Sequence, residues 1–352
     1  MTAYPPLAAL AAVMTLVLFA ALGWYVYGTP GSVFEDSDAP RVSVQPQDGP
    51  ATIVTVEQGA GARAIGGLLE SRGIIRSGRL FEVLVGLTGV QDSLEAGDYE
   101  FAPGTPAIEA VHRIAEGRTA SSEVTIPEGR RAEEVAEMLE QAGIVPRQDF
   151  LNALVKSRYS EPFLQQVAGE GLEGYLFPAR YSFPLGATAE QVVATMLRGF
   201  QDNVAAKTDA AAGTMTLDQV VTLASIVERE AAVKEERPLI AGVFLNRLRG
   251  GIALEADPTV QFAVAQDPAS VAQFGWWKKE LTLEDLKFAS PYNTYANPGL
   301  PPGPIASPGL AAVEAVLQPA QTEFLYFVAK ADGTHAFAST LEEHLANVEQ
   351  YQ

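Results

Sequence analysis

A carboxylate inside an apolar helical pattern is the side chain of this sequence best suited to chemistry. Glu228 lies in LASIVEREAA, residues 223–232. At about 100° per residue it falls among the apolar positions of a predicted helix, whereas its neighbours Arg229 and Glu230 fall outside them and are expected to be solvated. Burial disfavours the ionised form of a carboxyl group and raises its pKa. An acid that stays protonated near neutral pH could serve as a general acid.

A structural ion pair is the competing interpretation of Glu228. Arg247 also occupies an apolar arc, on the next predicted helix, and pairing with it would lower the pKa of Glu228 instead. Helical periodicity alone favours this ion pair over catalysis. A glycosidase normally uses two carboxylates. Either Asp257 or Glu255 could be the second, although Asp before Pro is also a common turn former.

Polar and aromatic side chains in predicted loops could complete a site. The segment SPYNTY contributes two tyrosines, an asparagine and a threonine at 292–295. Trp276 and Trp277 are adjacent and could stack on sugar rings. A loop packed against the core explains the same two tryptophans, so the sequence leaves both interpretations open.

Composition excludes several other kinds of chemistry. The chain has 352 residues and no cysteine, which rules out disulfides, thiolate metal ligands and a cysteine nucleophile. Its three histidines are widely spaced, so no metal centre or other cofactor is expected. The net charge of −19 disfavours a nucleic-acid partner, because phosphate binding needs a basic surface.

The N-terminal residues predict a membrane anchor. Leu7–Tyr27 is an uncharged apolar stretch of about 21 residues, long enough as a helix to cross a hydrocarbon layer of about 30 Å. Aromatic residues gather at its end, as in an interfacial belt. A cleaved signal peptide is the alternative, but its apolar core is usually shorter and its start basic. The residues that follow, rich in Gly, Pro, Ser and Asp, predict a tether.

An internal repeat follows the tether. VTVEQGAGARAIGGLLESRGII (54–75) recurs as VTIPEGRRAEEVAEMLEQAGIV (124–145), and each copy predicts a short strand, a glycine turn and an amphipathic helix. The second half of the unit, 97–114, recurs at 179–196. The second copy therefore holds about 12 extra residues, with LEGYLFP (172–178) just before the later match. An insertion of this kind could carry function, although a longer loop without function explains it equally well.

The helices expected to position Glu228 lie in the second half of the chain. Thr216 followed by Gln219 predicts a capping box and a helix that begins at Leu217. The next helix, ERPLIAGVFLNRL, is predicted to end at the two glycines 250–251.

Irregular loops and a hairpin complete the pattern. Residues 290–309 are rich in Pro and Gly, and EFLYFVAKADGTHAFAST predicts a β-hairpin that turns at Asp332 and Gly333. Helices, loops and a hairpin in this order predict an α+β fold.

Six motifs in order resemble one known family. TLASIVERE, VFLNRL, ADPTVQF, SPYNTY, GLPPGPIASPG and FLYFVAKADGTHAFASTLEEH closely resemble the MltG/YceG-like endolytic murein transglycosylases. The resemblance runs from about Val54 to the C-terminus and includes LEGYLFP and the N-terminal anchor.

The resemblance implies an α+β protein of four parts. These are a transmembrane anchor at 1–28, a tether at 29–52, a LysM-like α+β module at 53–120 and a YceG-like catalytic domain at 121–352. It further implies a single-pass protein of the bacterial inner membrane with a cytoplasmic N-terminus and an extracytoplasmic catalytic domain. The implied partners are peptidoglycan glycan strands, the membrane through Leu7–Tyr27, and peptidoglycan synthases.

The resemblance also implies an activity. Nascent glycan strands would be cut internally at the MurNAc–GlcNAc β-1,4 bond to give 1,6-anhydroMurNAc ends, which would limit strand elongation. The family places its catalytic acid at the first Glu of SIVE, here Glu228, and the C6 hydroxyl of the substrate replaces a second carboxylate. The Pro-rich loop 298–308 is expected to wall the groove. The residues expected to bind substrate are Glu173, Tyr175, Arg247, Asp257, Thr259, Gln261, Tyr292, Asn293, Thr294 and Tyr295.

Some positions depart from the family pattern, and two other functions stay open. LEADPTVQF has Glu255 and Ala256 where an amide and a small hydroxyl residue are expected, and Phe262 where Tyr is common. The first alternative is a non-catalytic peptidoglycan-binding or division scaffold. The second is a two-carboxylate glycoside hydrolase that uses Glu228 with Asp257 or Glu255.

Overall fold

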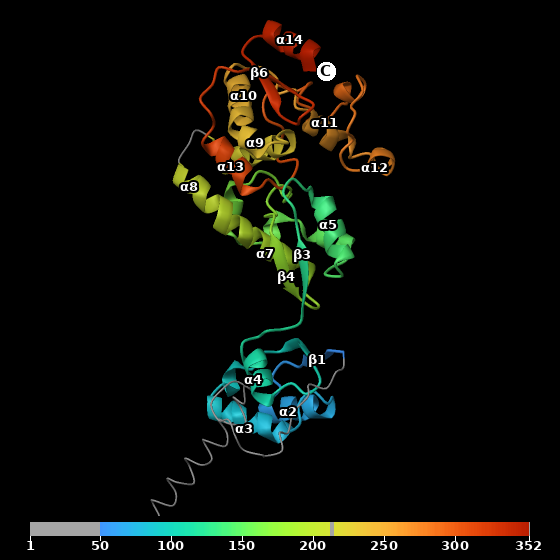
Figure 1. Cartoon of the computed structure of the whole chain (residues 1–352), viewed down its shortest axis with the longest axis vertical. Coiled ribbons are helices and arrows are strands. Elements are labelled where there is room, and N and C mark those ends of the chain that lie inside the picture. The colour runs from blue at the N-terminus through green and yellow to red at the C-terminus, as the bar shows by residue number, and fades with distance from the viewer. Residues whose placement is uncertain (1–49, 212–214, 352) are drawn as a thin grey trace, which may run out of the picture. The chain divides into compact units, whose positions relative to one another are not determined.

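The computed structural model describes residues 50–211 and 215–351, which form two compact units that divide after Ala120. The predicted anchor at Leu7–Tyr27 and nearly all of the predicted tether lie outside these residues. Within the described ranges, no helix is long and apolar enough to cross a membrane. The fold is mixed α+β (Figure 1).

The first unit is a two-stranded antiparallel sheet covered by three helices. Val54 of β1 lies opposite Tyr99 of β2, and their inward-facing side chains join a core that includes Phe81. Helices α2 and α3 approach closely at Gly66 and Gly78, where an added Cβ would lie 2.5 Å from the facing carbonyl oxygen. The elements are β1 (Thr52–Val56), α2 (Ala62–Ser71), α3 (Gly78–Thr88), a 3₁₀ turn (Gln91–Ser93), β2 (Gly97–Phe101) and α4 (Ala107–Ala115).

The second unit opens with the same arrangement, which confirms the repeat. Strands β3 and β4 pair antiparallel, and the predicted insertion lies between α6 and β4 with two short 3₁₀ turns, Lys156–Arg158 and Pro162–Gln166. The elements are β3 (Ser121–Thr125), α5 (Ala132–Gln141), α6 (Arg147–Ala153), β4 (Arg180–Pro184) and α7 (Ala189–Phe200).

Helices follow the repeat, and several predicted boundaries are confirmed. Thr216 and Gln219 exchange the two capping-box hydrogen bonds, at 2.9 and 3.3 Å, and α10 ends at Gly250. The hairpin turns at Gly333, which has a φ of +83°. The elements are a π-helical turn (Gln201–Ala205), α8 (Ala206–Ala211), α9 (Leu217–Glu230), a 3₁₀ turn (Lys234–Glu236), α10 (Arg237–Arg249), α11 (Asp257–Val264), α12 (Pro268–Phe274), a 3₁₀ turn (Asp285–Lys287), α13 (Leu310–Leu317), β5 (Tyr326–Ala329), β6 (His335–Ala338) and α14 (Leu341–Tyr351).

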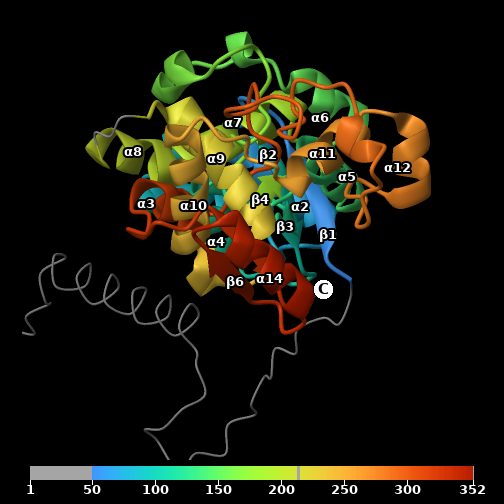
Figure 2. The same ribbon diagram turned by 90° about the horizontal axis from the view of Figure 1, so that it is seen from above.

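Helix α9 lies at the centre of this second unit. It packs against α10, α11 and α13, and both views show it between α10 and α11 (Figures 1 and 2). Its buried surface is wider than the predicted arc, because Thr222 and Ser225 are buried as well. The Ser225 hydroxyl accepts a hydrogen bond from the Ile305 N–H at 3.0 Å, which fastens the Pro-rich loop to the helix.

Asp257 and Pro258 do not form the turn that the sequence allowed for. Asp257 is the first residue of α11, followed by Pro258. Proline is tolerated in the first turn of a helix, where its missing N–H has no intrahelical partner. The Asp–Pro pair therefore begins a helix here rather than forming a separate turn.

Candidate active site

Three charged residues end α9: Glu228, Arg229 and Glu230. The C-terminal end of a helix carries a partial negative charge, which favours cations and disfavours carboxylates. Two glutamates in this last turn therefore start from an environment that raises their pKa values.

Glu228 is held in a buried ion pair. Its Oε1 lies 2.5 Å from Nη2 of Arg237, its Oε2 accepts a hydrogen bond from the Gly309 N–H at 3.1 Å, and its side chain is only 7% exposed. Burial raises the pKa of Glu228, while the charge of Arg237 and the Gly309 N–H oppose that rise. Both oxygens are engaged by the protein, which is the geometry of a structural pair.

The partner of Glu228 is Arg237, and the predicted pairing with Arg247 is wrong. Arg247 donates to the carbonyl oxygens of Ala253 and Leu325, at 2.9 and 2.6 Å, and to Glu255 at 3.0 Å. It ties the end of α10 to the C-terminal hairpin. The side chain of Glu255 is thereby directed to Arg247.

Glu230 and Arg229 are not the solvated charges that periodicity predicts. Burial is the main cause that raises the pKa of Glu230 to about 8, and the negative charge of Asp257 adds to it. Among the described residues, its carboxyl group makes no hydrogen bond or ion pair. The guanidinium of Arg229 covers the ring of Trp277 at 3.9 Å from the centroid. Elements from elsewhere in the chain therefore bury the face of α9 that was expected to meet water.

Asp257 of α11 and Tyr295 of the SPYNTY segment lie close enough to Glu230 for electrostatic interaction. The Tyr295 hydroxyl donates to Oδ1 of Asp257 at 2.7 Å. Burial and then this bond raise the pKa of Tyr295, and the charge of Glu230 contributes further. The structure thus brings two predicted site residues next to a carboxyl group that was not predicted.

Other residues of the same segment hold its shape. Thr259 and Thr294 are buried, and their hydroxyl oxygens lie 2.8 Å apart. The Asn293 side chain donates to the carbonyl oxygens of Leu286 and Phe288, both at 2.9 Å. These three side chains are occupied within the protein, which favours a supporting role over direct substrate contact.

The LEGYLFP insertion lies against both α5 and the Pro-rich loop. Glu173 accepts a hydrogen bond from the first N–H of α5, that of Ala132, at 2.9 Å, and burial raises its pKa to about 8. Gly174 faces Pro304 so closely that an added Cβ would lie 2.3 Å from the proline Cβ. The charge of Glu173 also raises the pKa of Tyr292, so these two predicted residues lie near each other.

Tyr175 and Gln261 bond to residues outside the last turn of α9. The Tyr175 hydroxyl donates to Asp218 at 2.6 Å, at the opposite end of α9. A cavity of about 700 Å³ also lies at that end, lined in part by Thr222 and Leu300 and by neither glutamate of the last turn. Gln261 donates to the carbonyl oxygen of Lys278 at 2.9 Å and so anchors the segment after Trp277.

Sequence reasoning missed Glu230, Arg237 and the contacts of the tryptophans. Helical periodicity describes one helix, whereas Arg237 lies on the next helix and Asp257 on α11. The sequence feature that could have pointed to the contacts of the tryptophans was the adjacency of Trp276 and Trp277. Within the described ranges, no group of three or more carboxylates and histidines could hold a metal ion.

Comparison with known proteins identifies the family to which this chain belongs. Residues 54–350 match the model of the YceG-like family, and the chain belongs to that family. A Bacillus subtilis endolytic murein transglycosylase is 31% identical over 85% of this chain and 84% of its own length. A Streptococcus pneumoniae protein with the same description is 29% identical over 85% of this chain and 58% of its own length. The crystal structure of a yceG-like protein from Listeria monocytogenes matches 84% of this chain and 98% of its own, with a TM-score of 0.57 and 32% identity.

Proposed function

We propose that this protein is an endolytic lytic transglycosylase that cuts peptidoglycan strands at the MurNAc–GlcNAc β-1,4 bond. Family membership supports the reaction class. The observation that carries the proposal is a partly buried carboxyl group, Glu230, with a pKa raised to about 8 and no bonded partner among the described residues. At neutral pH such a group is mostly protonated and free to meet a substrate.

The proton donor we propose is Glu230 rather than Glu228. The resemblance assigned Glu228, and that assignment stays a prediction. Its two oxygens are bonded to Arg237 and Gly309, at 2.5 and 3.1 Å, so a substrate would have to displace a buried guanidinium. Glu230 needs no such displacement, and it lies in the same turn of the same helix.

One carboxyl group can serve both steps of the reaction. Glu230 would donate its proton to the glycosidic oxygen while the bond from that oxygen to MurNAc C1 breaks, and the GlcNAc hydroxyl would leave. The resulting carboxylate would then take the proton of the MurNAc C6 hydroxyl as O6 bonds to C1, which closes the 1,6-anhydro ring and restores the acid. A raised pKa favours both steps, because it keeps the acid protonated and makes its conjugate base stronger.

The carboxylate of Asp257 supports a second candidate, a two-carboxylate hydrolase. Retaining and inverting glycosidases flank the bond with two carboxyl groups, and Asp257 is close enough to Glu230 to raise its pKa. In the transglycosylase proposal, Asp257 instead keeps Glu230 protonated and stabilises positive charge that develops at C1. Tyr295, bonded to Asp257 at 2.7 Å, holds that carboxylate in place.

The proposal extends to the setting of the enzyme. Leu7–Tyr27 would anchor the chain in the cytoplasmic membrane with the catalytic unit outside. The first unit would act as a LysM-like module that binds glycan. Cleavage of nascent strands by the membrane-anchored enzyme would limit strand elongation. The enzyme would act in association with a peptidoglycan synthase.

Mass spectrometry of the products tests the reaction. The full-length protein is incubated with uncrosslinked nascent glycan strands, and the new ends are identified. We expect 1,6-anhydroMurNAc ends on internal fragments. New reducing ends would instead establish the hydrolase, and no cleavage by folded protein would favour the binding scaffold.

A further inference from the structure

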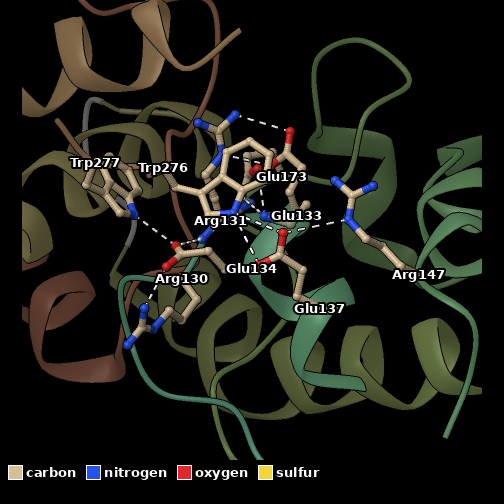
Figure 3. Close-up of polar contacts among 11 residues, drawn as sticks. Arg130, Arg131, Glu133, Glu134, Glu137, Arg147, Glu173, Trp276 and Trp277 are labelled. Carbon is tan, nitrogen blue, oxygen red and sulfur yellow. Dashed lines mark hydrogen bonds and ion pairs between the residues drawn. The ribbon is translucent and has the colours of Figure 1, made fainter. Parts of the chain in front are cut away.

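Two adjacent tryptophans are tied to one face of α5. The indole N–H of Trp277 donates to Oε2 of Glu134 at 2.8 Å, and that of Trp276 donates to the carboxylate of Glu137 at 3.2 Å (Figure 3). Both rings are only partly buried. Two partly exposed aromatic rings are thus held in fixed positions by side chains about 140 residues earlier in the chain.

The two rings cover different cations. Trp277 lies over Arg229, 3.9 Å from its guanidinium carbon, whereas Trp276 lies over Arg131 at 4.8 Å. Arg229 stands between Glu228 and Glu230 in the last turn of α9. Trp277 therefore contacts the helical turn that carries Glu230, the proposed acid. Trp276 is joined to Arg131, which pairs with Glu133 on α5.

Trp277 packs against the hydrophobic core of the second unit, and polar contacts hold it as well. Gln261 fixes the next residue by bonding the Lys278 carbonyl oxygen at 2.9 Å, and Glu134 also accepts from Arg130 at 2.6 Å. A rigid indole with one polar edge satisfied and a cation beneath it loses little conformational entropy when a ligand arrives. The apolar C–H face of a pyranose can pack on such a ring while its hydroxyls reach neighbouring carboxylates and guanidinium groups.

We propose that Trp277 is a stacking platform for a sugar ring of the glycan strand, next to the bond that is cut. This assignment rests on the proposed function, because the ligand is the same strand that Glu230 would cleave. Arg229 and Glu134 orient the indole, and Trp276 serves to cover Arg131.

Steady-state kinetics on peptide-free, uncrosslinked glycan strands test the platform. We expect Trp277→Ala to lower kcat/KM about tenfold or more, as truncation of a buried aromatic anchor commonly does, with anhydro ends still formed. Trp277→Phe keeps a ring and should retain most of the activity. Trp276→Ala is the matched control, since it removes the neighbouring ring and a similar hydrogen bond, and we expect kcat/KM within about twofold of the wild type.

Fluorescence gives a second measurement that does not require cleavage. The chain contains three tryptophans, so in the full-length Trp24→Phe protein all indole emission comes from Trp276 and Trp277. Addition of the glycan should change this emission, and a further Trp277→Phe change should remove most of the response. A response that survives Trp277→Phe, or equal kinetic losses in Trp277→Ala and Trp276→Ala, would overturn the assignment. If the wild type forms no anhydro ends, the proposed function fails, while the fluorescence response still decides whether Trp277 binds glycan.

Discussion

The two copies of the repeat have the same order of strands and helices but differ on one helix face. In both copies a glutamate near the end of the first helix accepts the first N–H of the next helix: Glu70 from Gly78 at 3.2 Å, and Glu140 from Arg147 at 2.9 Å. At four positions near the start of the first helix one copy has small neutral residues and the other has charged ones: Ala60, Gly61, Ala64 and Gly67 correspond to Arg130, Arg131, Glu134 and Glu137.

This comparison distinguishes residues that stabilise the fold, which both copies share, from residues of α5 that could contribute to the site. The shared glutamate and the buried apolar positions recur because both copies must close the same small core. The charged face of α5 forms no part of that core. It instead holds Trp276 and Trp277, which lie about 140 residues later in the chain (Figure 3). The two copies thus share one scaffold, and one helix face of the second copy makes contacts with a later segment of the chain.

The largest effect is expected from the acid. Glu230→Gln should lower kcat on uncrosslinked glycan by about 10²- to 10⁴-fold, the usual contribution of a general acid, while the protein stays folded. Wild-type kcat/KM should fall as the pH rises through about 8, where Glu230 loses its proton. Product formation is followed by chromatography across pH.

Glu228→Gln is the matched variant two residues away. We expect a weaker fold and a smaller loss of kcat, because its carboxylate is paired with Arg237. The opposite ranking, with Glu228→Gln inactive and Glu230→Gln active, would restore the assignment made from the resemblance.

The next largest effect is expected from the buried ion pair between Arg237 and Glu228, which lies in the second unit. Arg237→Met leaves the Glu228 carboxylate buried without its partner, which typically costs about 3–5 kcal/mol. Hydrogen exchange measured by mass spectrometry should show faster opening of residues 121–351 only. The first unit serves as an internal reference, since its described residues include no buried charged side chain. Equal loss of protection in both units would show that they unfold together.

Local features of the fold were predictable from sequence because a few neighbouring residues determine them. The capping box at Thr216 and Gln219 needs only two side chains three residues apart. The turn at Gly333 and the chain reversal after α10 at Gly251 depend on glycine, because the φ angles there are +83° and +66°. The repeat was visible because the cores of the two copies constrain the same positions.

The site was only partly predictable because its contacts join distant parts of the chain. Periodicity correctly placed Glu228 in an apolar environment but named Arg247 as its partner, since nothing local identifies Arg237. Glu230 was expected to be solvated, and this is wrong because Asp257 and the region of Trp277 lie more than 25 residues later in sequence and surround the end of α9. A helix end meets several elements, and the pattern of one helix cannot reveal them.

The pH dependence of stability should also differ between the units. Glu173 and Glu230 have pKa values raised from 4.5 to about 8, so between these pH values the folded state keeps protons that the unfolded state has released. The contribution of these two groups to the stability of the second unit should therefore be greatest below about pH 4.5, fall as the pH rises, and level off above about 8. Glu230→Gln should flatten this slope and stabilise the unit at pH 8 by about 1–3 kcal/mol.

Denaturant unfolding at pH 5 and pH 8, resolved by hydrogen exchange, measures this effect. The first unit again provides the reference, because its described core contains no carboxyl group. A Glu230→Gln protein with an unchanged slope would mean that Glu230 titrates normally, which would remove the main argument for it as the acid.

The smallest effects should come from the glutamate hydrogen bond that occurs in both copies, at Glu70 and at Glu140. Glu70→Ala and Glu140→Ala each remove one exposed carboxylate from the first N–H of a helix. The expected cost is about 0.5–1.5 kcal/mol, the usual effect of removing a side-chain acceptor from the first turn of a helix. If the bond belongs to the scaffold alone, each variant should destabilise only its own unit, by similar amounts, and neither should change kcat/KM. A loss of activity in Glu140→Ala without a matching effect in Glu70→Ala would mean that the functional surface of the second copy extends along α5 to its end.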